Sequence, residues 1–215
     1  MFQLIVFDLD GTLVDSKRDL ANATNTLLVE CGAAPLAEDR IGRMVGDGAA
    51  TLVARAFEAS AVARPPDALD RFLAIYAAHL LDHTRPYQDV PEVLAALADR
   101  AHLGVLTNKP LESTRRILDG LSLSRYFAPD AVVGGDGPFP RKPDPSGLRH
   151  LMARTGAAAR ETAMVGDSPI DLRTARAAAT PLYLARYGFG FDAQRSGELR
   201  PNERVIDNFR ELLAL

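Results

Sequence analysis

Two aspartates follow a short apolar run near the N-terminus. The run LIVF at residues 4–7 combines β-branched and aromatic side chains, which is typical of a strand buried on both faces of a parallel sheet. Asp8 and Asp10 come next, and because strand side chains alternate, we expect both to project to the same side. Carboxylates this close repel each other, so they indicate either an oxygen-preferring cation or a raised pKa.

A simple turn and a calcium-binding loop are the two alternatives for this run. Asp10-Gly11 is also a common turn dipeptide, so the pattern alone is compatible with a simple turn. A calcium-binding EF-hand loop is excluded by spacing. Counting from Asp8, the loop would need glycine where Leu13 stands and glutamate where Asp19 stands.

Two further polar segments follow predicted strands. Thr107 and Asn108 precede a predicted helix, where a hydroxyl and backbone N–H groups favour an anion site, although capping of that helix is the alternative. Lys142 lies between two prolines that stiffen its loop, although a solvated surface lysine is the alternative. A lysine fixed in this way would neutralise a bound phosphate and keep a nucleophilic carboxylate ionised.

A third polar segment follows the predicted strand at residues 162–165. Asp167 stands at the end of that strand, which favours a metal ligand. Ser168 and Asp171 have the spacing of a capping box, so Asp171 is open between capping and function. Because the polar groups occur in order at the ends of successive predicted strands, we expect them to converge on one site.

The rest of the chain divides by periodicity. Residues 17–84 show only helical spacing, whereas residues 85–215 alternate between short apolar runs and amphipathic helices. We expect strands at 103–106, 131–133, 162–165 and 182–185, helices at 90–100, 111–118, 145–154 and 169–178, and a closing helix after residue 207.

This alternation predicts an α/β fold, a doubly wound, Rossmann-like parallel sheet. The next polar strand end after Asp10 is Thr107, 107 − 10 = 97 residues later, whereas a βαβ crossover needs only about 30 residues. The excess predicts an inserted all-helical cap at residues 17–84, with the catalytic core formed by residues 1–16 and 85–215. Such a cap would close over the crevice and exclude water.

Composition limits the class of protein. The 215 residues are 47% hydrophobic and carry a net charge of −3, which is typical of a globular chain without a basic field for nucleic acid. Cys31 is the single cysteine, so no intrachain disulfide can form. No apolar run approaches a membrane span, and Asp8 interrupts the N-terminal run too early for a signal peptide. We expect a cytoplasmic monomer or homodimer.

Four ordered motifs carry a resemblance to a known family: DLDGTLVDS at residues 8–16, TNKP at 107–110, RKP at 141–143 and GDSPID at 166–171. Together they resemble the haloacid-dehalogenase-like hydrolase superfamily, whose fold has a helical cap inserted after the first motif. Within it, the segments YAAH at 76–79, RPY at 85–87 and VGGD at 133–136 are most similar to bacterial phosphoglycolate phosphatases.

The resemblance implies a role for each residue. Asp8 would attack phosphorus and form an aspartyl-phosphate, and Asp10 would act as general acid and then base. Mg²⁺ would be held by the carboxylates of Asp8 and Asp167 and the main-chain carbonyl of Asp10.

The remaining roles concern the phosphoryl group and its surroundings. Thr107, the Asn108 region and Lys142 would bind the phosphoryl oxygens. Asp171 would orient the metal shell or Lys142. In the cap, Arg43 and Gly46 belong to a glycine-rich break that could reach the substrate, with a helix–helix turn as the alternative.

Several branches of the superfamily can be separated. Dehalogenases lack the second carboxylate, so Asp10 argues against them, and phosphonatases need a cap lysine, which is absent between Asp19 and Thr84. We therefore expect a Mg²⁺-dependent phosphomonoesterase acting on a small anionic metabolite, with 2-phosphoglycolate first and a sugar or amino-sugar phosphate second. The alternatives are a phosphomutase or pyrophosphatase on the same scaffold, and a non-catalytic phosphate-binding protein. We expect no nucleic-acid or membrane partner.

Overall fold

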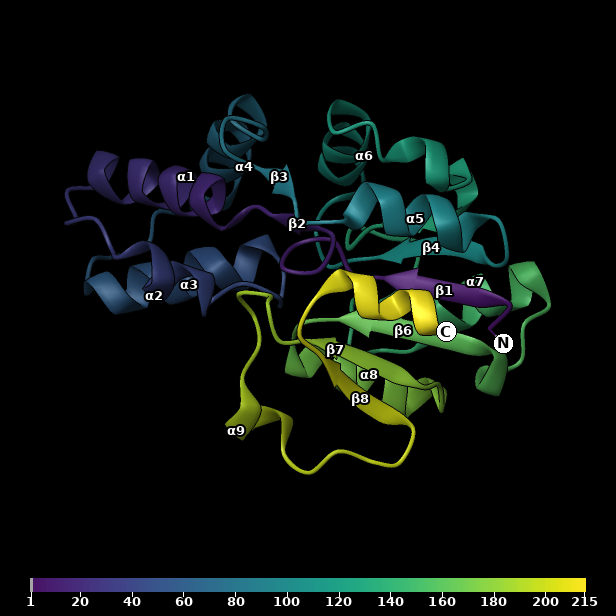
Figure 1. The fold of residues 1–215 in the computed structure, drawn as a ribbon. Coiled ribbons are helices and arrows are strands. Elements are labelled where there is room, and N and C mark those ends of the chain that lie inside the picture. The colour runs from purple at the N-terminus through teal and green to yellow at the C-terminus, as the bar shows by residue number, and fades with distance from the viewer. Residues whose placement is uncertain (1) are drawn as a thin grey trace.

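The computed structural model describes residues 2–215, and a six-stranded parallel sheet forms its centre. The strands lie in the order β5-β4-β1-β6-β7-β8, so the first strand of the chain is inside the sheet (Figure 1). Their bounds are β1 Leu4–Phe7, β4 His102–Leu106, β5 Val132–Val133, β6 Thr162–Gly166, β7 Leu182–Ala185 and β8 Glu203–Ile206. The predicted doubly wound parallel sheet is confirmed.

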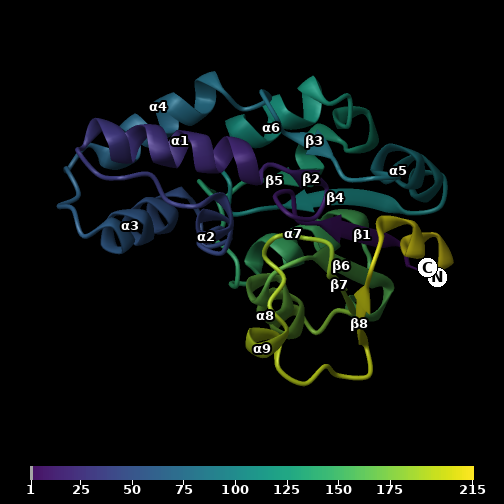
Figure 2. The same cartoon turned by 60° about the vertical axis from the view of Figure 1, so that its left-hand side comes forward.

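Helices cover both faces of the sheet because β1 is apolar on both sides. Ile5 and Phe7 pack into one hydrophobic cluster, with residues of α5 (Val90–Ala98), α6 (Leu111–Gly120) and the short 3₁₀ helix η4 (Phe209–Ala214). Leu4 and Val6 point to the opposite face, where α7 (Ser146–Thr155) and α8 (Pro169–Ala178) complete a second cluster. Alternation along one strand therefore explains the two helical layers seen in Figures 1 and 2.

Four helices lie beyond the carboxyl end of the sheet, in the segment between two very short strands, β2 (Val14–Asp15) and β3 (Arg85–Pro86). They are α1 Lys17–Glu30, α2 Glu38–Gly42, α3 Ala49–Ser60 and α4 Ala68–Ala78, and we call them, with their loops, the cap. β2 and β3 pair antiparallel, so the two chain crossings run side by side. This arrangement supports the predicted boundaries at residues 17 and 84, which stay a prediction.

One buried carboxylate joins the two crossings. Asp19, in the first turn of α1, is 1% exposed and accepts hydrogen bonds from the backbone N–H groups of His83 at 3.0 Å and Thr84 at 2.7 Å. The hydroxyl of Thr84 donates to the same carboxylate at 2.7 Å. The start of the cap is thus held against its end.

The C-terminal region differs in part from expectation. β8 was not predicted because its first two residues, Glu203 and Arg204, are charged and interrupt the apolar pattern of a core strand. Glu203 is nevertheless buried, because Arg176 of α8 pairs with it at 2.7 Å. The closing helix after Asp207 is a 3₁₀ helix. No helix among the described residues is long and apolar enough to cross a membrane.

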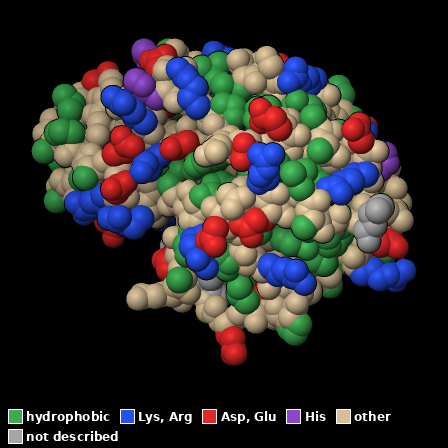
Figure 3. Space-filling view, in the orientation of Figure 1, with side chains coloured by type: hydrophobic (Ala, Val, Ile, Leu, Met, Phe, Trp, Pro, Cys, Tyr) green, Lys and Arg blue, Asp and Glu red, His purple; other side chains and the backbone are tan. Residues whose placement is uncertain are grey.

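The surface carries charges of both signs. On the face shown in Figure 3, basic and acidic side chains are interspersed and neither forms a broad patch. This agrees with the small net charge of −3.

Candidate active site

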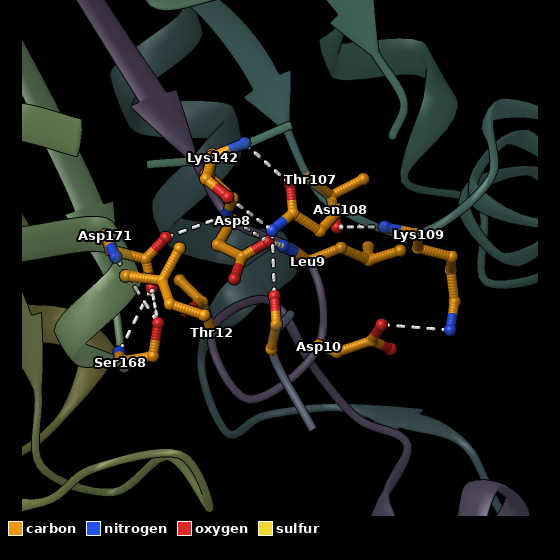
Figure 4. A network of polar contacts seen from close by, with 12 residues as sticks. Asp8, Leu9, Asp10, Thr12, Thr107, Asn108, Lys109, Lys142, Ser168 and Asp171 are labelled. Carbon is orange, nitrogen blue, oxygen red and sulfur yellow. Dashed lines mark hydrogen bonds and ion pairs between the residues drawn. The ribbon is translucent and has the colours of Figure 1, made fainter. Parts of the chain in front are cut away.

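Asp8 directly follows β1, a strand that is buried along its whole length. Its backbone N–H donates to the carbonyl of Val165 at 2.9 Å, so the β1–β6 ladder continues one residue past Phe7. The side chain is buried, and Oδ1 accepts from the Nζ of Lys142 at 2.8 Å and from the N–H of Leu9 at 2.7 Å. The strand therefore fixes the backbone, and Lys142 fixes the carboxylate (Figure 4).

Lys142 is a buried cation held by two carboxylates. Its Nζ lies 2.8 Å from Asp8 and 2.7 Å from Asp171. The side chain of Asn108 clamps its backbone, accepting from the Lys142 N–H at 2.8 Å and donating to the Lys142 carbonyl at 3.0 Å. The predicted fixed lysine is thus observed, and Asn108 contributes by positioning it.

Thr107 and Asn108 do not cap the helix that follows them. The N-cap position of α6 is Pro110, and the N–H of Leu111 donates to the carboxylate of Asp136 at 2.9 Å. Since the capping alternative is not realised, both residues are left to line the site.

Asp171 makes both the contacts of a helix cap and a contact with Lys142. Its Oδ2 accepts from the N–H of Ser168 at 3.0 Å and from the Ser168 hydroxyl at 2.6 Å, which completes a capping box at the start of α8. Its Oδ1 accepts from Lys142 at 2.7 Å. The helix cap is therefore also the second anchor of the site lysine.

Asp167 is enclosed by backbone. The N–H of Gly190 donates to its Oδ2 at 2.7 Å, and the hydroxyl of Thr12 lies 3.4 Å from Oδ1. Gly11 has a positive φ of 84°, and a Cβ there would lie 1.9 Å from Asp167 Oδ2. Only glycine allows the chain to pass this close to the carboxylate.

The three carboxylates of Asp8, Asp167 and Asp171 form a buried acidic cluster. One ligand oxygen from each lies within 4.8 Å of the others. Burial raises the pKa of Asp8 to about 6, although the charge of Lys142 opposes the increase. Burial, with the charges of Asp171 and Asp8, raises the pKa of Asp167 well above its usual value. Buried acids that repel each other in this way fit a divalent cation with oxygen ligands.

Asp10 has different partners from Asp8. Its carboxylate lies 2.9 Å from the Nζ of Lys109 and accepts from the hydroxyl of Ser16 at 2.5 Å. In Figure 4, Lys142 lies beside Asp8, whereas Lys109 lies beside Asp10. The two carboxylates thus line one pocket but are held by separate cations.

That pocket lies between the sheet and the cap and, with its open mouth, contains about 660 Å³ of empty space. The residues that line it from outside the cap include Asp8, Asp10, Thr107, Asn108, Lys109, Asp167 and Gly190. The cap contributes Gly46 to the lining, whose carbonyl accepts from Asn108 at 2.9 Å. Arg43 is exposed and is not among the lining residues, so the structure does not bring this predicted residue to the site.

Comparison with known proteins identifies the family. The sequence model described as haloacid dehalogenase-like hydrolase matches residues 5–185. The chain belongs to this family. A phosphoglycolate phosphatase of Rhodospirillum rubrum is 46% identical over 99% of this chain and 90% of its own. One from Colwellia psychrerythraea is 36% identical over 98% of this chain and 95% of its own.

The fold agrees with the sequence match. A crystal structure described as a predicted phosphoglycolate phosphatase from Haemophilus somnus superimposes with a TM-score of 0.88 at 29% identity. The match covers 99% of this hydrolase and 97% of that chain. The two relatives match over almost the whole chain, and the crystal structure has the same fold. Together they show that this hydrolase is a phosphatase.

Sequence reasoning gave no role to three residues that contact the acids of this hydrolase. They are Lys109 and Ser16, which bind Asp10, and Gly190, which binds Asp167. Lys109 directly follows Asn108, so its position at a strand end was a usable signal. Gly190 belongs to the glycine-rich run YGFG at 187–190 after β7, and only the approach of that loop to Asp167 shows its role.

Proposed function

We propose that this phosphatase is a Mg²⁺-dependent phosphomonoesterase that works through an aspartyl-phosphate on Asp8, with 2-phosphoglycolate as its substrate. The observation that carries the proposal is the placement of Asp8. It is fixed at the end of β1, paired to Lys142 at 2.8 Å, and shares a pocket with Asp10 and Asp167.

In the proposed reaction, a carboxylate oxygen of Asp8 attacks phosphorus and the ester bond breaks. Asp10 gives its proton to the leaving alkoxide, and then takes a proton from the water that hydrolyses the acyl phosphate. Asp10 lies two residues beyond Asp8 and lines the same pocket, so we expect the two carboxylates to serve attack at phosphorus and protonation of the leaving oxygen on one phosphoryl group.

The phosphoryl oxygens would be bound by Thr107, by backbone N–H groups near Asn108 and by Lys142. Since Lys142 is held by Asp8 and Asp171, its charge is in place before the substrate binds. The metal would be held by the carboxylates of Asp8 and Asp167 and the main-chain carbonyl of Asp10. When bound, Mg²⁺ supplies positive charge against the phosphoryl oxygens.

The substrate proposal rests on the relatives, which are named phosphoglycolate phosphatases over almost the full chain. The test is phosphate release from 2-phosphoglycolate, sugar phosphates, amino-sugar phosphates and pyrophosphate, each with Mg²⁺ or with a chelator. We expect 2-phosphoglycolate to have the highest kcat/KM and the chelator to abolish turnover. Higher kcat/KM on another ester would refute the substrate, and full activity with the chelator would refute the metal requirement.

A further inference from the structure

Lys109 is a second buried cation of the pocket, and the proposed chemistry does not use it. Its side chain is 4% exposed. Nζ lies 2.9 Å from Asp10 Oδ2, 2.8 Å from the hydroxyl of Tyr76 on cap helix α4, and 4.4 Å from the centre of the Tyr76 ring. A buried lysine placed this way joins the core to the cap beside the proposed acid.

The hydrogen-bonding capacity of this pair is not filled. A lysine ammonium has three donors, and Asp10 and Tyr76 accept two of them. Among the described residues, no side chain or carbonyl accepts the third donor of Lys109, and none accepts the proton of the Tyr76 hydroxyl. Both groups line the pocket, so both can donate to an anion inside it.

The cap wall offers little else that is polar. Of the pocket-lining residues that the described cap provides, only Tyr76 has a polar side chain. The others are Leu20, Val45, Gly46, Gly48, Ala49, Leu52, Phe72 and Leu73. A sugar would leave several hydroxyls without partners against this wall, which is costly in a buried site. A small leaving group with one negative charge fits better.

The position of Lys109 limits how far the bound anion can lie from the ester oxygen of the substrate. In the proposed function, Asp10 contacts the ester oxygen, and Lys109 is bonded to that same carboxylate. In an ester of a 2-hydroxy acid, a single carbon separates the ester oxygen from the carboxylate, so a group adjacent to Asp10 is within its reach. We infer that Lys109 and Tyr76 bind the substrate carboxylate and make this enzyme selective for phosphorylated 2-hydroxy acids.

This inference rests on the proposed function, and one ratio tests it. We measure kcat/KM for 2-phosphoglycolate and for its uncharged carboxamide analogue, using wild type and Lys109→Met. Any disturbance of Asp10 slows both esters alike, so the ratio reports recognition of the carboxylate. We expect the ratio to fall about 10- to 100-fold in Lys109→Met, as for loss of a charge-assisted hydrogen bond.

Two further variants control the measurement. Arg43→Met removes one positive charge from an exposed cap position outside the pocket lining, and its ratio should equal that of wild type. Tyr76→Phe removes only a hydroxyl and should lower the ratio about 3- to 10-fold. It decides the question if Lys109→Met does not fold.

The outcomes separate the inference from the proposed function. Wild type that releases phosphate from 2-phosphoglycolate, together with a ratio unchanged within twofold in Lys109→Met or in a folded Tyr76→Phe, overturns the inference alone. Wild type without activity on either ester overturns the proposed function, and the inference with it. A ratio that falls equally in Arg43→Met would show a general charge effect and would also overturn the inference.

Discussion

Replacing Asp19 by alanine should strongly destabilise the junction between cap and core. Asp19 is 1% exposed, and its carboxylate accepts from two backbone N–H groups and from the hydroxyl of Thr84, which is fully buried. Each such charged hydrogen bond contributes about 1.5–3 kcal/mol, and alanine leaves all three donors without an acceptor. Because water can enter the space left by the side chain, we expect a net loss of about 3–5 kcal/mol.

Thermal and urea unfolding measure this loss. For a chain of this length, each kcal/mol lowers Tm by about 2–4 °C, so Asp19→Ala should lower Tm by about 6–20 °C. Asp19→Asn keeps one acceptor oxygen and should lie between wild type and Asp19→Ala. The matched control is Asp82→Ala, because that cap carboxylate is 54% exposed and, within the described part of the chain, pairs only with His79, so the substitution should cost less than about 1 kcal/mol.

A loss below about 1 kcal/mol in Asp19→Ala would refute this reasoning. It would mean that water satisfies the three donors as well as the carboxylate does, and that the hydrogen bonds of Asp19 do not stabilise the junction between cap and core. A loss equal to that of Asp82→Ala would lead to the same conclusion.

Four other expectations concern the site. Asp8→Asn should lower turnover at least about 1,000-fold, because an amide is a poor nucleophile, and denaturing mass spectrometry should find no phosphorylated protein; activity near wild type would contradict the covalent route. Asp167→Ala should raise the half-saturating Mg²⁺ concentration about tenfold or more, and an unchanged titration would remove Asp167 from the ligand set. Gly11→Ala, with a Cβ 1.9 Å from Asp167 Oδ2, should weaken the Mg²⁺ response and lower stability by about 1–3 kcal/mol, whereas Gly32→Ala has a similar φ of 80° and open space, so it should keep the Mg²⁺ response. Because burial raises the pKa of Asp8 to about 6, protons should compete with Mg²⁺ as pH falls through 6, so calorimetry should find weaker binding at pH 5 than at pH 7; equal affinities would contradict the raised pKa.

Sequence periodicity was sufficient for most of the framework. Residues 4–7 form β1 and residues 182–185 form β7 as predicted, because a strand buried on both faces must be apolar throughout. β8 escaped prediction because its buried Glu203 is paired to Arg176, 27 positions away, and such a partner cannot be read from local pattern.

For the site residues as well, some features could be predicted from the sequence and others required the tertiary structure. Asp8, Asp167 and Lys142 could be proposed from the sequence, since the carboxyl ends of neighbouring parallel strands, and the loops beyond them, must meet at one edge of the sheet. The sequence also offered Lys142 as the cation beside the nucleophile and as one partner of Asp171, whereas the pairing of Asp10 with Lys109 was decided only by the tertiary structure. Lys142 contacts Asp8 and Asp171, while Lys109 contacts Asp10 and a tyrosine of the cap.

The linear sequence therefore determined where the strands end and which charged side chains are available there. Folding decided their pairing, because each ion pair depends on loops and cap helices that are distant in sequence and adjacent only after the chain packs. The Asp10–Lys109–Tyr76 contact shows this most clearly, since it joins residues 10, 76 and 109 at distances of 2.9 and 2.8 Å. Neither a strand pattern nor the spacing of motifs predicts such a contact.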